Sequence, residues 1–188
     1  LKGIRLFETT SELPAKDDAD ELSLGADLQH DVCAWFSYNA GIHLSSYIYH
    51  HKPYWACDPR ITLRFTPATD HTIALHYGIY HQYFHKTGLT SGGLPTDFFF
   101  LADKTFLPEW SHNLNLRYST AFLQNRYSLT AELYFKQIYH IAESASNVLQ
   151  LLNQPFSYDD YVISGNGRNY GLNLMFQRNS GIVTGYVS

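Results

Sequence analysis

Residues 59–84 read PRITLRF-TPATDH-TIALHYGIYHQYF, which is two alternating segments joined by a short polar turn. Three apolar side chains of the first segment fall on one face of a predicted strand: Ile61, Leu63 and Phe65. Three polar side chains fall on the other face: Arg60, Thr62 and Arg64. Such a two-faced strand fits the half-buried sheet of a soluble protein. It also fits the wall of a membrane β-barrel, which has lipid on one side and a polar lumen on the other.

The composition narrows the function classes without deciding between these two interpretations. The chain has 188 residues and a formal net charge of −4, so it lacks the basic footprint of a nucleic-acid-binding protein. The longest uninterrupted apolar runs are only a few residues long, so no segment predicts a transmembrane helix. The rest of the sequence must therefore decide the environment of the sheet.

Alternating segments continue along most of the chain and predict an all-β fold. Residues 1–20 are polar and irregular, and we expect a loop there. Residues 21–188 predict about eight strands in an antiparallel up-and-down meander, with long loops at about 85–109 and 145–160. One possible helix, at residues 145–152, lies in the second long loop.

The predicted connections between strands alternate in length. Four are short, and lie near residues 34, 69, 125 and 180. Three are longer, and lie near residues 51, 97 and 152. Soluble β-sandwiches have no physical reason to sort their loops in this way, whereas outer-membrane barrels have short periplasmic turns and long external loops. The alternation therefore favours a membrane barrel.

Aromatic residues gather near both ends of the predicted strands. One group lies near the short turns: Phe36, Phe65, Phe122, Tyr127 and Phe176. The other group lies near the longer connections: Tyr49, Tyr54, Trp55, Tyr80, Tyr83, Trp110, Tyr139 and Tyr161. Amphipathic rings are stable at the headgroup level of a bilayer, so two aromatic levels are typical of a membrane barrel.

The polar face of the predicted strands carries the mid-strand charges. We expect six of its titratable side chains to line the lumen or to contact a plug inside it: Arg60, Arg64, His76, Arg117, Glu132 and Lys136. Asp27 and His43 fall on the same face. Charges at mid-strand are costly in lipid and much less costly in a wet or protein-filled lumen. They fit the solvent face of a soluble sheet as well, so the charges alone do not separate the two classes.

The sequence offers little for catalysis or metal binding. His81 and His85 would lie roughly 13 Å apart in one strand, which is too far to share an ion. No Ser-His-Asp set or carboxylate pair has a convincing context, so we expect no enzyme activity, no cofactor and no metal. The spaced glycines of residues 165–171 precede no helix, which argues against a phosphate-binding loop.

Loop residues are better candidates for substrate contact, because loops on a rigid scaffold often carry binding residues. The first long loop contains an aromatic group of this kind: Phe98, Phe99 and Phe100, with Trp110 close behind. The alternative is that these rings pack loop against loop or anchor the chain at an interface.

Several segments, in their order along the chain, carry a resemblance to a known family. They are NAGIHLS at 39–45, DPRITLRF at 58–65, IALHYGIYHQY at 73–83, PTD at 95–97, ADKT at 102–105, PEWSHNLNL at 108–116, ELYFK at 132–136 and GNGRNYGLN at 165–173. In this order they resemble the barrel of TonB-dependent outer-membrane receptors, in particular those of Bacteroidetes-type bacteria. The likeness covers roughly residues 21–188, and it rests on order and spacing because no single motif decides it.

The resemblance implies a barrel of about 22 strands, a plug domain in its lumen and an N-terminal region that contacts the TonB complex. Residues 1–188 would then be a single, partial segment of that barrel, and we expect the plug and the remaining strands to be absent from it. The implied location is the bacterial outer membrane, and the implied function is nutrient uptake. The implied partners are membrane lipid, the plug domain of the same receptor, the TonB complex, a surface lipoprotein and a small-molecule or oligosaccharide nutrient, with no nucleic acid.

Two alternatives stay open. A self-contained eight-stranded outer-membrane barrel, porin-like or adhesin-like, requires the first and last strands to pair. A soluble β-sandwich or lipocalin-like ligand-binding module requires the face with Ile61, Leu63 and Phe65 to be buried in a protein core. The cysteines test the proposed register, because it places Cys33 and Cys57 at opposite ends of the strands and unbonded.

Overall fold

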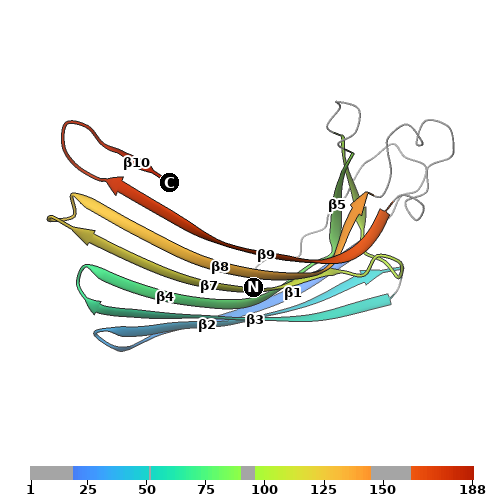
Figure 1. Cartoon of the computed structure of the whole chain (residues 1–188). Coiled ribbons are helices and arrows are strands. Elements are labelled where there is room, and N and C mark those ends of the chain that lie inside the picture. Colours follow the sequence, from blue (N-terminus) through green and yellow to red (C-terminus); the bar gives the residue numbers. More distant parts are fainter. Residues whose placement is uncertain (1–18, 51, 90–95, 145–161) are drawn as a thin grey trace.

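The structure, a computed structural model, describes residues 19–50, 52–89, 96–144 and 162–188. Eight of its strands form one antiparallel sheet (Figure 1). They are β1 (Ala19–Cys33), β2 (Phe36–Tyr49), β3 (Lys52–Ala68), β4 (His71–Gln82), β7 (Glu109–Phe122), β8 (Tyr127–Ser144), β9 (Val162–Arg178) and β10 (Gly185–Val187). They pair in the order β1-β2-β3-β4-β7-β8-β9-β10, which confirms the predicted all-β meander.

A separate hairpin, β5 (Phe84–Leu89) and β6 (Thr96–Leu101), lies in the connection from β4 to β7. The sequence predicted a loop at 85–109, and this prediction was wrong for the two strands. The glycines and the proline in this segment are typical of loops, so the sequence carried no sign of the short pairing. The pairing runs from Phe84–Leu101 to Leu89–Thr96. The hairpin projects from one end of the main sheet, which we call the long-loop end; the opposite end is the short-turn end (Figure 1).

Two other boundaries differ from the prediction, and one predicted helix cannot be compared with the structure. β1 begins at Ala19, inside the loop expected at 1–20. The connection near residue 51 is short rather than long, because β2 continues to Tyr49 and β3 starts at Lys52. The helix predicted at 145–152 lies outside the described residues.

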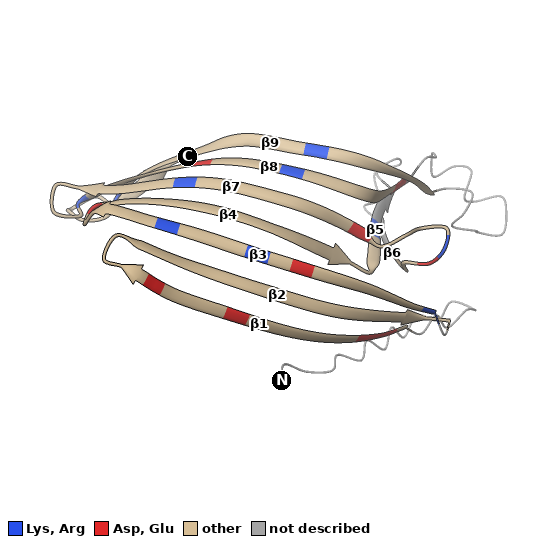
Figure 2. Cartoon of the chain, turned by 90° about the horizontal axis from the view of Figure 1, so that it is seen from below, with Lys and Arg blue, Asp and Glu red and all other residues tan. Residues whose placement is uncertain are grey.

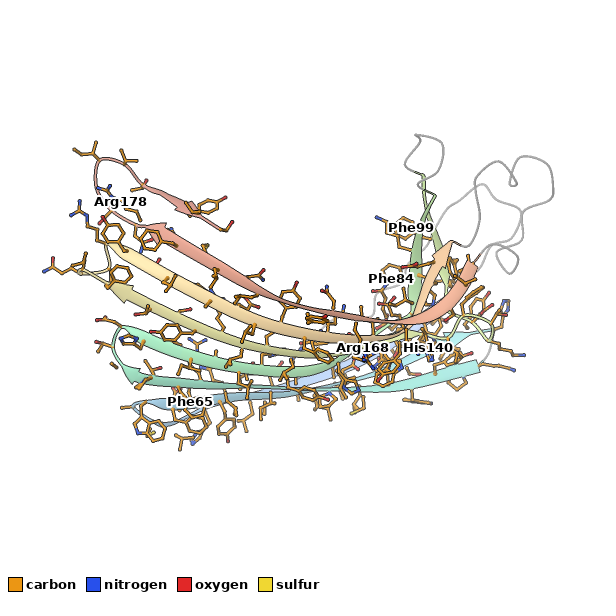
Figure 3. The ribbon with its side chains drawn as sticks, viewed as in Figure 1. Phe65, Phe84, Phe99, His140, Arg168 and Arg178 are labelled. Atoms are coloured by element: carbon orange, nitrogen blue, oxygen red, sulfur yellow. The ribbon has the colours of Figure 1, made fainter. Side chains whose placement is uncertain are left out.

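One face of the sheet is mainly apolar from β1 to β9. A single cross-strand row illustrates it, with one residue from each of seven strands: Leu28, Ala40, Ile61, Tyr77, Leu114, Phe135 and Tyr170. The predicted apolar face of β3 and β4 is confirmed, since Leu63 lies opposite Leu75 and Phe65 opposite Ile73. The sheet is curved, and Phe65 lies on its convex side (Figure 3).

No described element covers the convex face. Its leucines remain exposed, with 53% of Leu133 and 55% of Leu172 accessible. The buried residues form two small clusters instead, and both contain residues of the connection between β6 and β7. In the described part of the chain, no helix has the length and apolarity needed to cross a membrane.

The sheet is open among the described residues, with β1 at one edge and β10 at the other. β10 pairs with β9 over three residues only. Cys33 and Cys57 are both unbonded, as predicted, and both are exposed. Their partners on β2, Phe36 and Leu44, are separated by about 26 Å at the usual rise of a strand.

Candidate functional site

The six titratable residues predicted for the lumen share the concave face: Arg60, Arg64, His76, Arg117, Glu132 and Lys136. One cross-strand row contains three of them, because Arg64 lies opposite Ala74, which lies opposite Arg117, which lies opposite Glu132. The six come from β3, β4, β7 and β8, so they form a broad polar surface rather than a single cluster.

Arg60 forms a bidentate ion pair with Asp27 across an intervening strand. Its Nε and Nη2 donate to the two carboxylate oxygens at 3.0 and 2.6 Å. β2 lies between the two residues and carries no charged side chain (Figure 2). Gly41 of β2 lies opposite both Asp27 and Arg60. A Cβ atom at position 41 would lie 2.6 Å from Arg60 Nε, so the pair requires the glycine.

Unlike Arg60, the other basic residues of the concave face have no acidic partner among the described residues. Within the described part of the chain, no ion pair involves Arg64, Arg117 or Lys136. Glu132 lies directly opposite Arg117 and forms no ion pair with it there. These charges are therefore available to a molecule that occupies the concave side.

His76 contributes differently, through hydrogen bonds to neutral groups. Its Nδ1 lies 2.9 Å from the Thr62 hydroxyl and its Nε2 lies 2.9 Å from the Tyr80 hydroxyl. These contacts tie the imidazole to β3 and to its own strand. His76 therefore reinforces the sheet in this structure.

β3 and β4 separate toward the long-loop end, where a buried aspartate links them. Their pairing starts at Arg60 and Gly78, so the outer half of β3 has no β4 partner. Asp58 accepts hydrogen bonds from the backbone N–H and the Nδ1 of His81, at 3.3 and 2.5 Å. His43 Nδ1 lies 3.8 Å from the same carboxylate. Over the described ranges, no group of three His, Cys, Asp or Glu residues is placed to hold a metal ion.

Stacked tyrosines fill the space where the strands separate. The rings of Tyr47 and Tyr83 are parallel, with centroids 4.7 Å apart, and both are buried. The Tyr83 hydroxyl bonds the Ser45 hydroxyl at 2.5 Å, and the Tyr47 hydroxyl donates to the Ala102 carbonyl at 3.1 Å. Ala102 follows β6, so this cluster fixes the base of the β5–β6 hairpin to the sheet.

The hairpin divides its aromatic residues between two faces. Phe84 and Phe99 are 49% and 58% exposed and lie on the projecting hairpin (Figure 3). The Lys86 ammonium lies 5.8 Å from the centre of the Phe99 ring. Phe100 packs instead against the buried cluster of Phe106, Ala142 and Val162. Of the two predicted phenylalanines whose side chains the structure describes, Phe99 therefore offers an exposed ring and Phe100 packs inward; the side chain of Phe98 lies outside the described residues.

His85 is the buried centre of the inner face of the hairpin. It is 1% exposed, its ring stacks on Phe100 at 5.1 Å, and its Nε2–H donates to the Leu107 carbonyl at 3.1 Å. Its Nδ1 has no hydrogen-bond partner. Burial lowers the pKa of the His85 imidazole, against the opposing effects of the Leu107 carbonyl and the acidic Glu109. The histidine is therefore neutral near pH 7.

Trp110 belongs to a different surface from Phe99. It lies on β7, where it stacks on Tyr139 at 4.2 Å and on His81 at 6.0 Å. It lines a shallow hollow of about 200 Å³ with other residues of the long-loop end: Tyr54, Trp55, Ala56, His81, Tyr83, Leu107, Pro108 and His140. The structure thus places Phe99, Phe100 and Trp110 of the predicted group in different surroundings rather than in one site.

The sequence missed Phe84 and Lys86 as partners of Phe99. In the structure Lys86 pairs with Phe99, and Phe84 is two residues away on the same side of β5. Because the sequence predicted a loop at 85–109, it gave no basis for placing these three side chains together.

Comparison with known proteins supports the fold. No protein-family model and no curated protein matches the sequence. Among solved structures, the chain is similar to the alcaligin outer membrane receptor FauA from Bordetella pertussis, with a TM-score of 0.52 and 17% sequence identity. The match covers 86% of this chain and spans only 28% of the FauA chain. At this identity the likeness is one of fold.

Proposed function

We propose that this chain is part of the barrel of an outer-membrane receptor that takes up a nutrient in a TonB-dependent manner. In this proposal the convex face contacts lipid and the concave face contacts a plug domain of the same receptor. The long-loop end faces the outside of the cell, and the TonB complex acts through another part of the protein. The chain itself has no catalytic role. A surface lipoprotein and a Bacteroidetes-type source belong to the same proposal.

The observation that carries the proposal is the bare convex face. Rows of large apolar side chains cross seven strands, and no described layer covers them. In water such a face would be an aggregation hazard. In lipid it is the expected outer surface of a barrel, with every second residue facing the hydrocarbon. The similarity to an outer-membrane receptor fold supports the same environment.

The ring contacts agree with two interfacial levels. At the short-turn end, Phe36 stacks on Phe65 at 4.8 Å, and Tyr127 stacks on Phe176 at 5.7 Å. At the long-loop end, Trp110 stacks on Tyr139. Aromatic rings at both levels are typical of barrels that contact headgroups on each side.

Capture of the nutrient would fall to the exposed side of the hairpin. Phe84 and Phe99 offer apolar rings, and Lys86 adds a cation beside Phe99. Such a surface suits a small molecule or an oligosaccharide, because sugar faces and other flat apolar groups pack on aromatic rings.

The described residues do not make the contacts that the two alternative folds, a self-contained barrel and a soluble sandwich, require. A self-contained eight-stranded barrel needs β1 and β10 to pair, and they lie at opposite edges of the sheet. A soluble sandwich needs a second layer over Ile61, which is 40% exposed on the bare face.

Fractionation and uptake of the full-length protein test the proposal. We expect the protein in the outer-membrane fraction, with a gel mobility that shifts on heating as folded barrels do. We also expect growth on the limiting nutrient to depend both on this gene and on a functional TonB complex. Recovery of a monomeric protein in buffer without detergent would refute the barrel, and growth that is independent of TonB would refute the transport mechanism.

A further inference from the structure

Arg64 and Arg117 form a pair on the concave face, which we call the arginine pair. Both lie opposite Ala74 of β4, one on each side of that strand. Their Cα atoms are therefore two strand spacings apart, about 10 Å. Only the methyl group of Ala74 stands between them, and both side chains are exposed.

The structure contains a direct precedent for side chains that meet over such a gap. Asp27 and Arg60 are also two strands apart, and the small residue between them is Gly41. They reach each other with a 2.6 Å contact. Two arginines are longer than an arginine and an aspartate, so Arg64 and Arg117 can both reach a point above Ala74.

The two pairs differ in charge. Asp27 neutralises Arg60, whereas two guanidinium groups that meet above Ala74 repel each other, and an anion between them would offset this repulsion. The described residues supply none, because Glu132 opposite Arg117 forms no ion pair with it. Guanidinium groups bind carboxylates and phosphates in a planar, bidentate geometry, and a carboxylate is the anion that a polypeptide side chain supplies.

The depth of the pair identifies the kind of molecule that supplies the carboxylate. Ala74 lies eight residues from the last residue of β4, about 26 Å from the long-loop end, and three residues from the first, about 10 Å from the short-turn end. A molecule bound at the outer end of the sheet does not reach this level, whereas a polypeptide segment that lies on the concave face near the short-turn end does. The surrounding surface is mostly neutral and polar, with Ser37 opposite Arg64 and Asn173 opposite Glu132, so it does not favour a polyanion.

We propose that Arg64 and Arg117 jointly bind an aspartate or glutamate of the polypeptide segment that occupies the concave face. This inference rests on the proposed function, in which a plug domain occupies the lumen. It assigns to that domain an acidic side chain at the level of Ala74, and it assigns Arg60 to an ion pair within the barrel.

Photo-crosslinking in the full-length protein tests this contact. Ser119 lies on β7, on the same face as Arg117 and two residues away, so benzoylphenylalanine at position 119 samples the neighbourhood of the pair. After irradiation in outer membranes, we expect a crosslink within the same polypeptide, mapped by mass spectrometry to a segment that contains Asp or Glu. We expect Arg64→Glu with Arg117→Glu to reduce the yield at least tenfold.

Matched variants separate this contact from general damage. Arg60→Gln removes a charge that Asp27 already neutralises, and it should leave the crosslink yield within twofold. If the double glutamate variant does not fold, Arg64→Gln and Arg117→Gln replace it, each with an expected loss of about threefold. Changing the mapped acidic residue to lysine should restore the crosslink in the double glutamate variant.

The outcomes distinguish this inference from the proposed function. A protein that reaches the outer membrane and shifts on heating, yet crosslinks equally with and without the arginine pair, refutes the inference alone. A crosslink to lipid only, or to a segment without a carboxylate, also refutes it. A protein that never reaches the outer membrane refutes the proposed function instead.

Discussion

Gly41 allows charged residues of two non-adjacent strands to bind each other. Any other residue at this position would place a Cβ atom against the Asp27 carboxylate and the Arg60 guanidinium. Alternation along each strand predicted which face these side chains share. It did not predict the ion pair, because pairing across β2 depends on a strand register that one strand alone does not contain.

Gly41→Ala should break this ion pair. The new Cβ would lie 2.6 Å from Arg60 Nε, so the flexible guanidinium must move away. The paired side chains are 38% and 47% exposed, so we expect a loss of about 0.5–1 kcal/mol in the free energy of unfolding. Urea titration of the full-length protein in lipid vesicles measures it.

Gly25→Ala is the matched control for that substitution. It lies on the same face of β1, and the nearest atom to its Cβ, in His43, would be 3.6 Å away. Both variants share the gain in strand propensity, so their difference isolates the contact. Equal effects of the two substitutions would contradict the role assigned to Gly41.

His85 should make the docking of the hairpin sensitive to pH. Burial lowers the pKa of the His85 imidazole in the docked state, whereas in an undocked hairpin that pKa would have its ordinary value of about 6.5. As pH falls through that range, the undocked state binds a proton that the docked state does not. Docking is therefore fully stable above about pH 7 and weakens at lower pH.

Amide hydrogen exchange of β5 and β6 measures this effect, after correction for the intrinsic exchange rate. We expect faster opening at pH 5.5 than at pH 7.5 in the wild type. His85→Phe should abolish the difference, because a phenyl ring fills the same buried space without titrating. A pH dependence that persists in His85→Phe would assign the effect to another group.

At the scale of elements, the β5–β6 hairpin has an outer face with exposed rings and an inner face that docks on the sheet. Three consecutive phenylalanines gave no alternation, so the sequence could not assign Phe99 outward and Phe100 inward. The pairing of six residues on each strand settles both. Long strands such as β3 and β8 were easier to predict, because apolar and polar residues alternate along most of their length.

Phe99→Ala and Phe100→Ala should therefore have different effects. Phe100 packs on a buried cluster, so its loss should weaken docking by about 2–3 kcal/mol and raise the protease sensitivity of the hairpin. Phe99 is exposed, so its loss should leave protease sensitivity unchanged. It should instead raise the nutrient concentration needed for half-maximal uptake several-fold. Identical phenotypes for the two variants would argue against the two-faced hairpin.

At the scale of the whole molecule, the open curved sheet has two chemically distinct sides. The sequence predicted these sides because the alternation keeps its phase from strand to strand. It did not predict the separation of β3 from β4 at the long-loop end, where Asp58, His81 and the stacked tyrosines take the place of backbone pairing. Such contacts join residues distant in sequence, and no local pattern marks them.

Leu133→Arg tests the environment of the convex side. Leu133 is 53% exposed at mid-strand, and an arginine there in a bilayer should cost about 2–4 kcal/mol. We expect a reduced fraction of heat-modifiable, folded protein in outer membranes. Asn115→Arg, on the concave face of β7, is the control and should be tolerated. A soluble sheet would tolerate both substitutions equally.

The Asp27–Gly41–Arg60 crossing also bears on how the chain finds its strand register during folding. A slip of two residues between β2 and its neighbours keeps every side chain on its own face, so alternation alone does not penalise it. The same slip would bring Asn39 or His43 to the crossing and block the ion pair with a side chain. The glycine thus favours one alignment of the three strands over its nearest competitors.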